Sequence, residues 1–281
     1  MSRVDAHHHV WDLTVRDQTW MVGPELEPIR RNFSIDDLAP VAAAAGVTAT
    51  VLVQTVGVLA ETREFLEVAA SNELVAGVVG WVDLTAPDIA DVLAELQARP
   101  DGQYLKGIRH QVHDEPDLEW LLRPDVQRGL AAVADAGLVY DLLTKPPHLS
   151  AAVRAVQALP QLSFVVDHIS KPVVGEPLDP WASDLRALAA FPNVTCKLSG
   201  MVTEADWVAW TPADLKPYAD VVLDAFTPDR VMFGSDWPVC LLAASYPDVV
   251  AAAEALTSQL TSTEREAVFT TTATTTYNLK A

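Results

Sequence analysis

Short apolar, β-branched runs alternate with amphipathic stretches along the whole chain. Apolar runs of roughly four to eight residues are typical of buried strands, and longer stretches with a period near 3.6 are typical of helices. Strands are predicted at residues 4–9, 49–54, 75–82, 105–111, 138–143, 163–169, 194–200 and 231–235. Helices are predicted at residues 36–45, 61–70, 88–98, 125–136, 150–159, 181–190, 213–226, 247–259 and 263–276.

Eight strands, each followed by a helix, in a chain of 281 residues predict a (β/α)8 TIM barrel. An open, doubly wound α/β sheet is the alternative, but it usually carries a Gly-rich phosphate loop after its first strand, where this chain reads HHHVWD. No linker, charge block or repeat interrupts the pattern, so one domain is expected over residues 1–281. In such a barrel, polar residues at the carboxyl ends of strands are the candidates for chemistry.

Charge and composition narrow the function classes. Nineteen Lys and Arg against 38 Asp and Glu give a net charge of −19, which disfavours nucleic acid and anionic membranes as partners. Cys196 and Cys240 lie in apolar stretches and are expected to be reduced core residues. The sequence shows no apolar run of membrane-spanning length and no apolar signal region, so a cytoplasmic enzyme is expected. The oligomeric state is left open, a homo-oligomer included.

Three consecutive histidines lie in the first predicted strand. Alternation places His7 and His9 on one face, roughly 7 Å apart along the backbone, and His8 on the other face, toward the helices. A His-x-His pair at a strand end is typical of metal ligands or of a carbonyl-binding pair. A purification tag would be longer and followed by a linker. Three solvent-exposed histidines without a function would not lie within an apolar strand pattern.

Two further strands end in pairs of polar residues. Arg109 and His110 should point to opposite faces, and Arg109 is the better candidate for the barrel mouth because its planar guanidinium can grip a carboxylate or carbonyl oxygen. Asp167 and His168 should likewise alternate, so only one of them is expected in the site.

The last two strands add a lysine and an aspartate. Lys197 and Ser199 share a face, and a buried lysine is rare without a partner or a function, although a structural hydrogen-bond set would also explain it. Asp236 follows the eighth strand, which lies beside the first in a closed barrel, so it can approach His7 and His9. A helix cap is its alternative role.

Several motifs together resemble a known family. The stretches DAHHHVWD, GVVGWVDL, LKGIRH, DHISKP, CKLSG and MFGSDWPVC, from residue 4 to about 246, are similar to the amidohydrolase superfamily. More narrowly, they resemble its amidohydrolase-related sugar lactonases, of the L-fuconolactonase and L-rhamnono-lactonase type. This resemblance implies a (β/α)8 barrel that hydrolyses cyclic esters of sugar acids. Relatives that open dicarboxylate lactones or sulfomuconolactone are the first alternative.

The resemblance also implies a site. The usual two-metal centre lacks its carboxylated lysine or glutamate on the fourth strand here, so a single Zn²⁺ held by His7, His9, His168 and Asp236 is expected. Some lactonases of this branch work without metal, which leaves the requirement open. Asp236 would take a proton from the attacking water, and Zn²⁺, the three histidines or Arg109 would face the developing oxyanion.

The substrate is expected to be a small lactone bound by loops at the barrel mouth. The first loop, residues 10–33, is the longest, and long loops without structure of their own tend to be functional. Aromatic side chains can stack on the C–H faces of sugars, although core packing is an equally frequent role for tryptophan. The candidate substrate contacts are Arg109, His110, Lys197, Trp11, Trp81, Trp237 and Arg30.

Two rival functions keep the same fold. One is a Zn²⁺-dependent decarboxylase of aromatic acids, which uses the same kind of ligands but would release CO₂ instead of a proton. The other is a barrel that binds a sugar acid without catalysis, which the four polar residues at the strand ends make less attractive.

Overall fold

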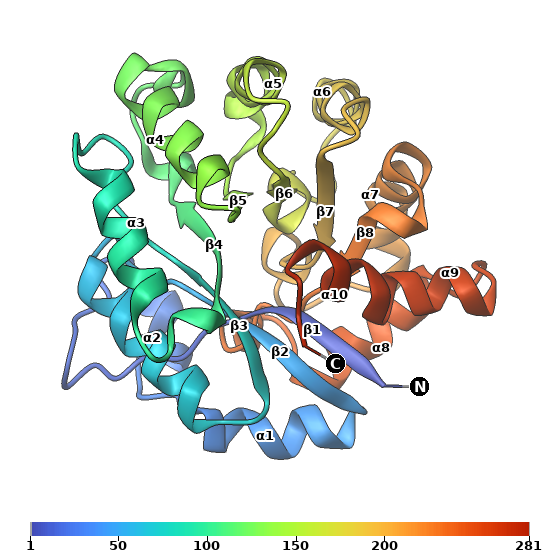
Figure 1. The fold of residues 1–281 in the computed structure, drawn as a ribbon. Helices are drawn as coiled ribbons and strands as arrows, with labels where there is room; N and C mark the ends of the chain where they lie inside the picture. Colours follow the sequence, from blue (N-terminus) through green and yellow to red (C-terminus); the bar gives the residue numbers. More distant parts are fainter. Residues whose placement is uncertain (1, 281) are drawn as a thin grey trace.

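The predicted strands form one parallel sheet whose order follows the chain, β1-β2-β3-β4-β5-β6-β7-β8. The computed structural model describes residues 2–280, and Figure 1 shows the strands in the centre with helices around them. The strands are β1 Arg3–His8, β2 Val47–Val53, β3 Val75–Gly80, β4 Leu105–His110, β5 Val139–Leu142, β6 Phe164–Val166, β7 Val194–Leu198 and β8 Val231–Phe233.

The sheet curls until β8 meets β1. Beyond the last regular pairing, the amide of His9 donates to the Trp237 carbonyl at 2.7 Å, and the amide of Asp236 donates to the His7 carbonyl at 2.8 Å. These bonds join the carboxyl ends of β1 and β8, so the predicted (β/α)8 barrel is confirmed and its first and last strands are neighbours.

Amphipathic helices surround the sheet, and each strand from β1 to β8 is followed by one. Capping boxes start several of them; at α7, for example, Thr211 and Asp214 satisfy the free amides of the first turn. No helix within residues 2–280 is long and apolar enough to cross a membrane. The helices are α1 Ile35–Ala44, α2 Leu59–Ser71, α3 Ile89–Ala98, α4 Pro124–Asp135, α5 Leu149–Ala158, α6 Trp181–Ala189, α7 Pro212–Phe226, α8 Tyr246–Leu256, α9 Ser262–Glu266 and α10 Thr272–Thr276.

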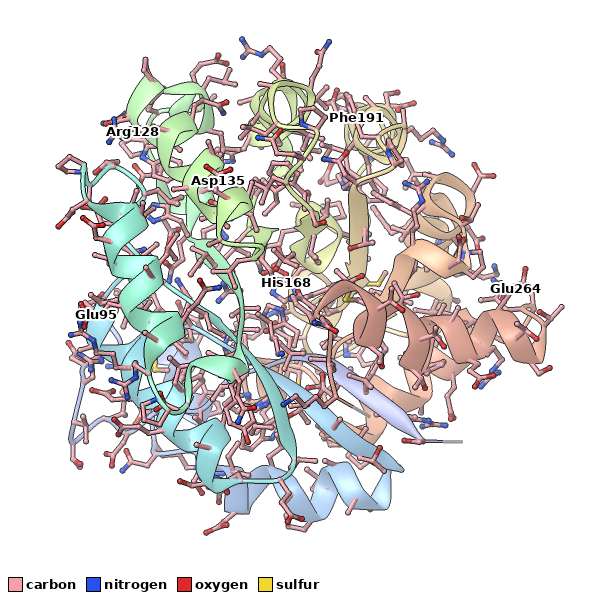
Figure 2. All side chains as sticks on the ribbon, viewed as in Figure 1. Glu95, Arg128, Asp135, His168, Phe191 and Glu264 are labelled. Atoms are coloured by element: carbon pink, nitrogen blue, oxygen red, sulfur yellow. The ribbon has the colours of Figure 1, made fainter. Side chains whose placement is uncertain are left out.

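Apolar side chains form a larger core between sheet and helices and a smaller one inside the barrel. In Figure 2, His168 lies near the centre of the molecule, whereas Glu95, Arg128 and Glu264 lie on outer helices. The inner core joins residues of the strands to Tyr277 and Leu279, which follow α10. The C-terminal segment therefore closes the amino-terminal end of the barrel, and the opposite end is left for the polar residues.

Candidate active site

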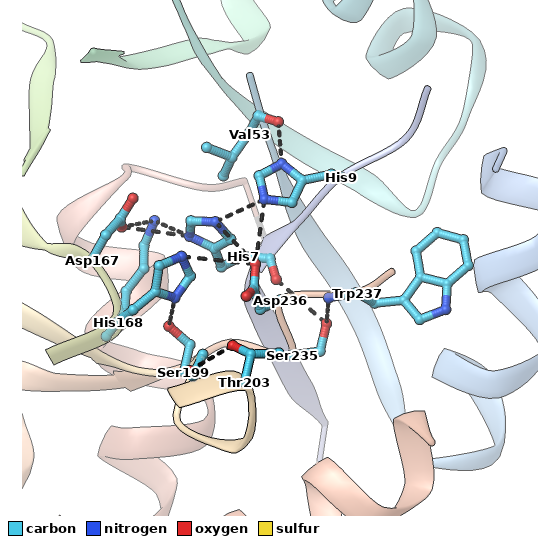
Figure 3. A network of polar contacts seen from close by, with 12 residues as sticks. His7, His9, Val53, Asp167, His168, Ser199, Thr203, Ser235, Asp236 and Trp237 are labelled. Atoms are coloured by element: carbon cyan, nitrogen blue, oxygen red, sulfur yellow. Dashed lines mark hydrogen bonds and ion pairs between the residues drawn. The ribbon is translucent and has the colours of Figure 1, made fainter. Parts of the chain in front are cut away.

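The two alternating histidines of β1 turn toward each other at the barrel mouth. The Nε2 atoms of His7 and His9 lie 3.2 Å apart, and their rings cross at 81°. His8 points away, with its Nε2 2.9 Å from the Thr50 hydroxyl, and it is fully buried. The expected division of the three histidines between two faces matches the structure (Figure 3).

Asp236 reaches the histidines because the chain turns sharply after β8. Its φ is 57°, a left-handed conformation that is uncommon for a non-glycine residue. The Asp5 carboxylate accepts the Ser235 amide at 2.8 Å and holds this turn against β1. Gly234 permits the close approach, since a Cβ there would lie 2.7 Å from the Cβ of His7.

His168 enters the site from a second unusual turn, where one sequence expectation is wrong. Strand β6 ends at Val166, and φ is positive from His168 to Lys171, so strand alternation no longer applies. Asp167 and His168 are both buried, and both lie against the ring of His7, whereas only one of them was expected in the site. The Nδ1 atom of His168 lies 2.8 Å from the Ser199 hydroxyl.

The hydrogen-bond partners fix the proton on the ring of His9. Its Nδ1 atom lies 2.7 Å from the Val53 carbonyl, which can only accept, so His9 carries its proton there and its Nε2 offers a lone pair. Both nitrogens of His7 lie beside cations: Nε2 is 3.2 Å from Arg109 Nη1, and Nδ1 is 3.1 Å from Lys197 Nζ. A neutral His7 accepts from one of these two cations and carries its proton on the other nitrogen.

The Asp236 carboxylate forms a cluster with His7, His9 and His168. Its Oδ1 atom lies 3.4 Å from His9 Nε2, 3.8 Å from His7 Nε2 and 3.7 Å from His168 Nε2. Zinc bonds of 2.0–2.1 Å in a tetrahedron place ligand atoms about 3.4 Å apart. The candidate ligand atoms of His7, His168 and Asp236 all lie within 4.8 Å of one another. His7, His168 and Asp236 thus offer nitrogen and oxygen atoms at separations that fit one divalent cation, and His9 Nε2 lies beside two of them.

Burial sets the charge state of the site. It lowers the pKa of His7 well below its usual range and that of His168 to about 3, so both rings are neutral near pH 7. Burial alone would raise the pKa of Asp236, but the nearby His168 and His9 lower it below the ordinary value. Asp236 is therefore an ionised carboxylate beside two neutral imidazoles.

Two buried cations lie beside the cluster. Arg109 donates from Nη1 to Asp167 Oδ2 at 2.9 Å and is held on its other side by Gln54. Lys197 lies beneath the cluster, with its Nζ 2.6 Å from Asp141 Oδ2 and 2.9 Å from Asp167 Oδ1. Asp141 and Asp167 were not among the predicted site residues, and a buried lysine without an obvious partner was the signal that could have led to them.

A cavity of about 260 Å³ opens above the cluster, a size suited to a small ligand. Eight of its lining residues were not among the predicted site residues, because most lie in loops where alternation gives no guide to direction. Its lining comprises His9, Trp20, Thr55, Arg109, Gln111, His113, Asp114, Leu143, His168, Lys171, Asp236 and Val239.

Six predicted substrate contacts do not line this cavity. Lys197 is beneath the histidines, as described. His110 stacks on Trp120, with ring centroids 4.2 Å apart, and accepts a hydrogen bond from Trp81 Nε1 at 3.1 Å. Alternation explains this outcome, since His110 faces the helices when Arg109 faces the barrel.

The other three predicted substrate contacts, Trp11, Trp237 and Arg30, lie in the first loop or pack against it. Trp11 is buried and donates to the Arg31 carbonyl at 2.7 Å. Trp237 points away from the histidines in Figure 3, and its ring packs on Phe33 at 5.3 Å. Arg30 donates to the Met21 carbonyl and lies beside Glu27. These side chains build the loop, and Trp20 is its residue at the cavity.

Comparison with known proteins places this geometry in a family. The sequence profile described as "Amidohydrolase" matches residues 4–279. An L-fucono-1,5-lactonase of Burkholderia multivorans is 39% identical over 95% of this chain and 93% of its own. A second L-fucono-1,5-lactonase, from Burkholderia ambifaria, is 38% identical over 88% of this chain and 83% of its own.

Solved structures also resemble this chain. A crystal structure of an amidohydrolase from Burkholderia multivorans with bound zinc superimposes with a TM-score of 0.93, at 38% identity and over 100% of both chains. A probable 2-pyrone-4,6-dicarboxylic acid hydrolase from Acinetobacter baumannii shares the fold, with a TM-score of 0.78 at 20% identity over 99% of this chain and 100% of its own. This chain belongs to the amidohydrolase family.

Proposed function

We propose that this chain is a hydrolase that opens the lactone of a sugar acid, and that L-fucono-1,5-lactone is its best candidate substrate. One observation carries the proposal: an ionised Asp236 lies 3.4–3.8 Å from three histidines at the floor of a small-molecule cavity. Similarity to two L-fucono-1,5-lactonases supports the choice of substrate.

The chemistry begins with water attacking the lactone carbonyl. Asp236 is ionised and accepts the proton that the water loses. All three of its contacts with the histidines involve Oδ1, which leaves Oδ2 for this transfer. When the ring C–O bond breaks, the same carboxyl group returns the proton to the ring oxygen, which leaves as an alcohol. The carboxylic acid product then ionises and releases one proton to the solvent.

The negative charge on the carbonyl oxygen needs a preformed cationic environment. Arg109 lines the cavity with its guanidinium fixed between Asp167 and Gln54, so its positive charge is held beside the cavity without reorganisation. A divalent cation held by His7, His9, His168 and Asp236 would add Lewis-acid polarisation of the carbonyl and acidify a bound water.

The charges around the cavity favour a neutral substrate. The two cationic residues of its lining are committed, Arg109 to Asp167 and Lys171 to Glu204. Burial lowers the pKa of His113, so this ring is uncharged near pH 7. Asp114 and Asp236 add negative charge. A dicarboxylate or sulfonated lactone would need uncommitted cations to replace its hydration, whereas a neutral polyol lactone needs only hydrogen-bonding groups.

A panel assay separates this proposal from its rivals. Purified protein is mixed with L-fucono-1,5-lactone, 2-pyrone-4,6-dicarboxylate or an aromatic carboxylic acid, with and without added Zn²⁺, and both proton release and CO₂ release are followed. We expect catalysed proton release from the sugar lactone alone. Turnover of the dicarboxylate alone would replace the substrate class, CO₂ from the aromatic acid would identify a decarboxylase, and binding without turnover would identify a non-catalytic barrel.

A further inference from the structure

A line of buried polar contacts joins the C-terminal segment to the histidine cluster. The Tyr277 hydroxyl lies 2.9 Å and 2.8 Å from the two carboxylate oxygens of Asp141. Asp141 Oδ2 lies 2.6 Å from Lys197 Nζ, and this nitrogen lies 3.1 Å from His7 Nδ1. All four side chains are buried. Because Asp141 accepts and the phenol donates, the tyrosine hydroxyl stabilises the charged carboxylate.

Tyr277 reaches this position only because the chain end enters the barrel. It follows α10 and packs with Leu279 against the apolar residues at the amino-terminal end of the strands. In Figure 1 the C-terminus and α10 lie beside β1. An apolar residue would fill the same space, so packing alone does not require a hydroxyl there.

We propose that Tyr277 is a positioning residue of the active site, whose hydroxyl holds Asp141 against Lys197 and so keeps the lysine ammonium fixed beneath the ring of His7. The proposal uses the lactonase function for its kinetic readout only. Its zinc-binding readout depends on the cluster of His7, His9, His168 and Asp236 and is independent of the substrate.

Loss of the Tyr277 hydroxyl should affect the histidine cluster through the buried charges that lie beneath it. Asp141 and Asp167 together offset Lys197, and Asp167 also faces His7 Nδ1 at 3.4 Å. Without the hydroxyl of Tyr277, the buried Asp141 carboxylate is less stable and compensates Lys197 less well. Lys197 then interacts more strongly with Asp167 and competes with His7 for that carboxylate. The positive charge of Lys197 is also less well compensated, and it repels a cation bound by the cluster above. Both changes weaken cation binding, because partners of a ligand histidine tune its affinity.

The same contacts predict a shift in pH dependence. Burial raises the pKa of Asp141 to about 6, although Lys197 acts to lower it. Two other groups face Asp141: the Asp167 carboxylate raises its pKa, and the Tyr277 hydroxyl lowers it. Loss of that hydroxyl should raise the pKa further. Asp141 would then be protonated at a higher pH, and activity should decline earlier on the acidic side.

Tyr277→Phe tests the proposal, and β5 offers a matched control. The hydroxyl of Tyr140 is equally buried and has no hydrogen-bond partner among residues 2–280, so Tyr140→Phe removes a phenol oxygen without breaking a hydrogen bond. Zinc dissociation constants are measured by competition with a chromophoric chelator, and kcat/KM for the lactone is measured across the acidic and neutral pH range.

For Tyr277→Phe we expect zinc binding to weaken by about 10-fold and the acidic limb of kcat/KM to move to higher pH, with neither change in Tyr140→Phe. The proposal is overturned if neither readout distinguishes the two variants. If Tyr277→Phe does not fold, Asp141→Asn decides, and zinc affinity equal to wild type in that variant overturns it. A protein that opens no lactone yet loses zinc affinity in Tyr277→Phe would refute the proposed function and sustain this proposal.

Discussion

The Nε2 atoms of His7 and His9 lie 3.2 Å apart, and Asp236 Oδ1 lies 3.4 Å from the Nε2 of His9. Because the His9 proton is on Nδ1, its Nε2 directs a lone pair into this space. His168 Nε2 lies 3.7 Å from the same Asp236 oxygen. This convergence of imidazole nitrogens on a carboxylate suits a divalent cation.

Added Zn²⁺ should therefore stabilise the folded protein. A ligand present at 100 times its dissociation constant contributes about 2.7 kcal/mol to the free energy of unfolding, which a thermal shift measurement detects easily. We expect Zn²⁺ to raise the Tm of chelator-treated wild type and of His8→Ala, and to leave the Tm of His9→Ala nearly unchanged. Equal shifts in the two variants would show that zinc binds elsewhere.

His8 and His9 should also separate activity from stability. His9→Ala removes an acceptor at the cavity floor, and we expect kcat/KM to fall on the order of 10²-fold. His8→Ala should keep most of the activity, but it removes one of the two hydrogen-bond partners of the Thr50 hydroxyl, which also donates to the Leu74 carbonyl at 3.2 Å. The lost hydrogen bond should cost about 0.5–1.5 kcal/mol in the free energy of unfolding. Steady-state kinetics and urea unfolding of both variants check this, and equal losses of activity would contradict the orientation of β1.

Acid should destabilise the protein partly through His8. Burial lowers its pKa in the folded state to about 3, from 6.5. The unfolded chain therefore binds the extra proton first, so the stability is fully present above pH 6.5 and declines as the pH falls toward 3, by about 1.4 kcal/mol per pH unit. Urea unfolding of wild type and His8→Gln across this pH window isolates the contribution. The stability difference between them should shrink as the pH falls, and a constant difference would refute the assignment.

Lys197 should be essential for folding stability. It lies between Asp141 and Asp167 at 2.6 Å and 2.9 Å, and all three side chains are fully buried. Lys197→Met leaves two carboxylates without their shared cation, and breaking a buried ion pair costs about 3–5 kcal/mol. The double variant Lys197→Met with Asp141→Asn should recover part of that loss. A double-mutant cycle from denaturant unfolding measures the coupling, and additive losses would argue against a coupled pair.

The barrel was predictable because its strands are read from alternation and apolar runs, which depend only on neighbouring residues. His7, His9 and Arg109 also followed from alternation, since each lies on or directly after a regular strand. Asp236 followed from barrel closure, which brings β8 beside β1. Where strand periodicity holds, the sequence indicated both the face and the neighbours of a side chain.

Where the backbone leaves the strand conformation, periodicity failed. Asp167 and His168 lie in a turn with φ of 50° at His168, so both enter the site. Loop residues such as Trp20 reached the cavity, while Trp11 and Trp237 turned into the core. The contact between the Tyr277 hydroxyl and the Asp141 carboxylate joins residues 136 positions apart, and no local sequence pattern predicts it.

Proton release from L-fucono-1,5-lactone by wild type and by Asp236→Asn tests the central claim most directly. The asparagine keeps the size of the side chain but cannot accept the proton of the attacking water. We expect rapid release with wild type and a loss of kcat on the order of 10³-fold in a variant that unfolds at a similar temperature. Equal turnover by both proteins would contradict the assignment of Asp236 as the base, and no turnover by wild type would contradict the lactonase function itself.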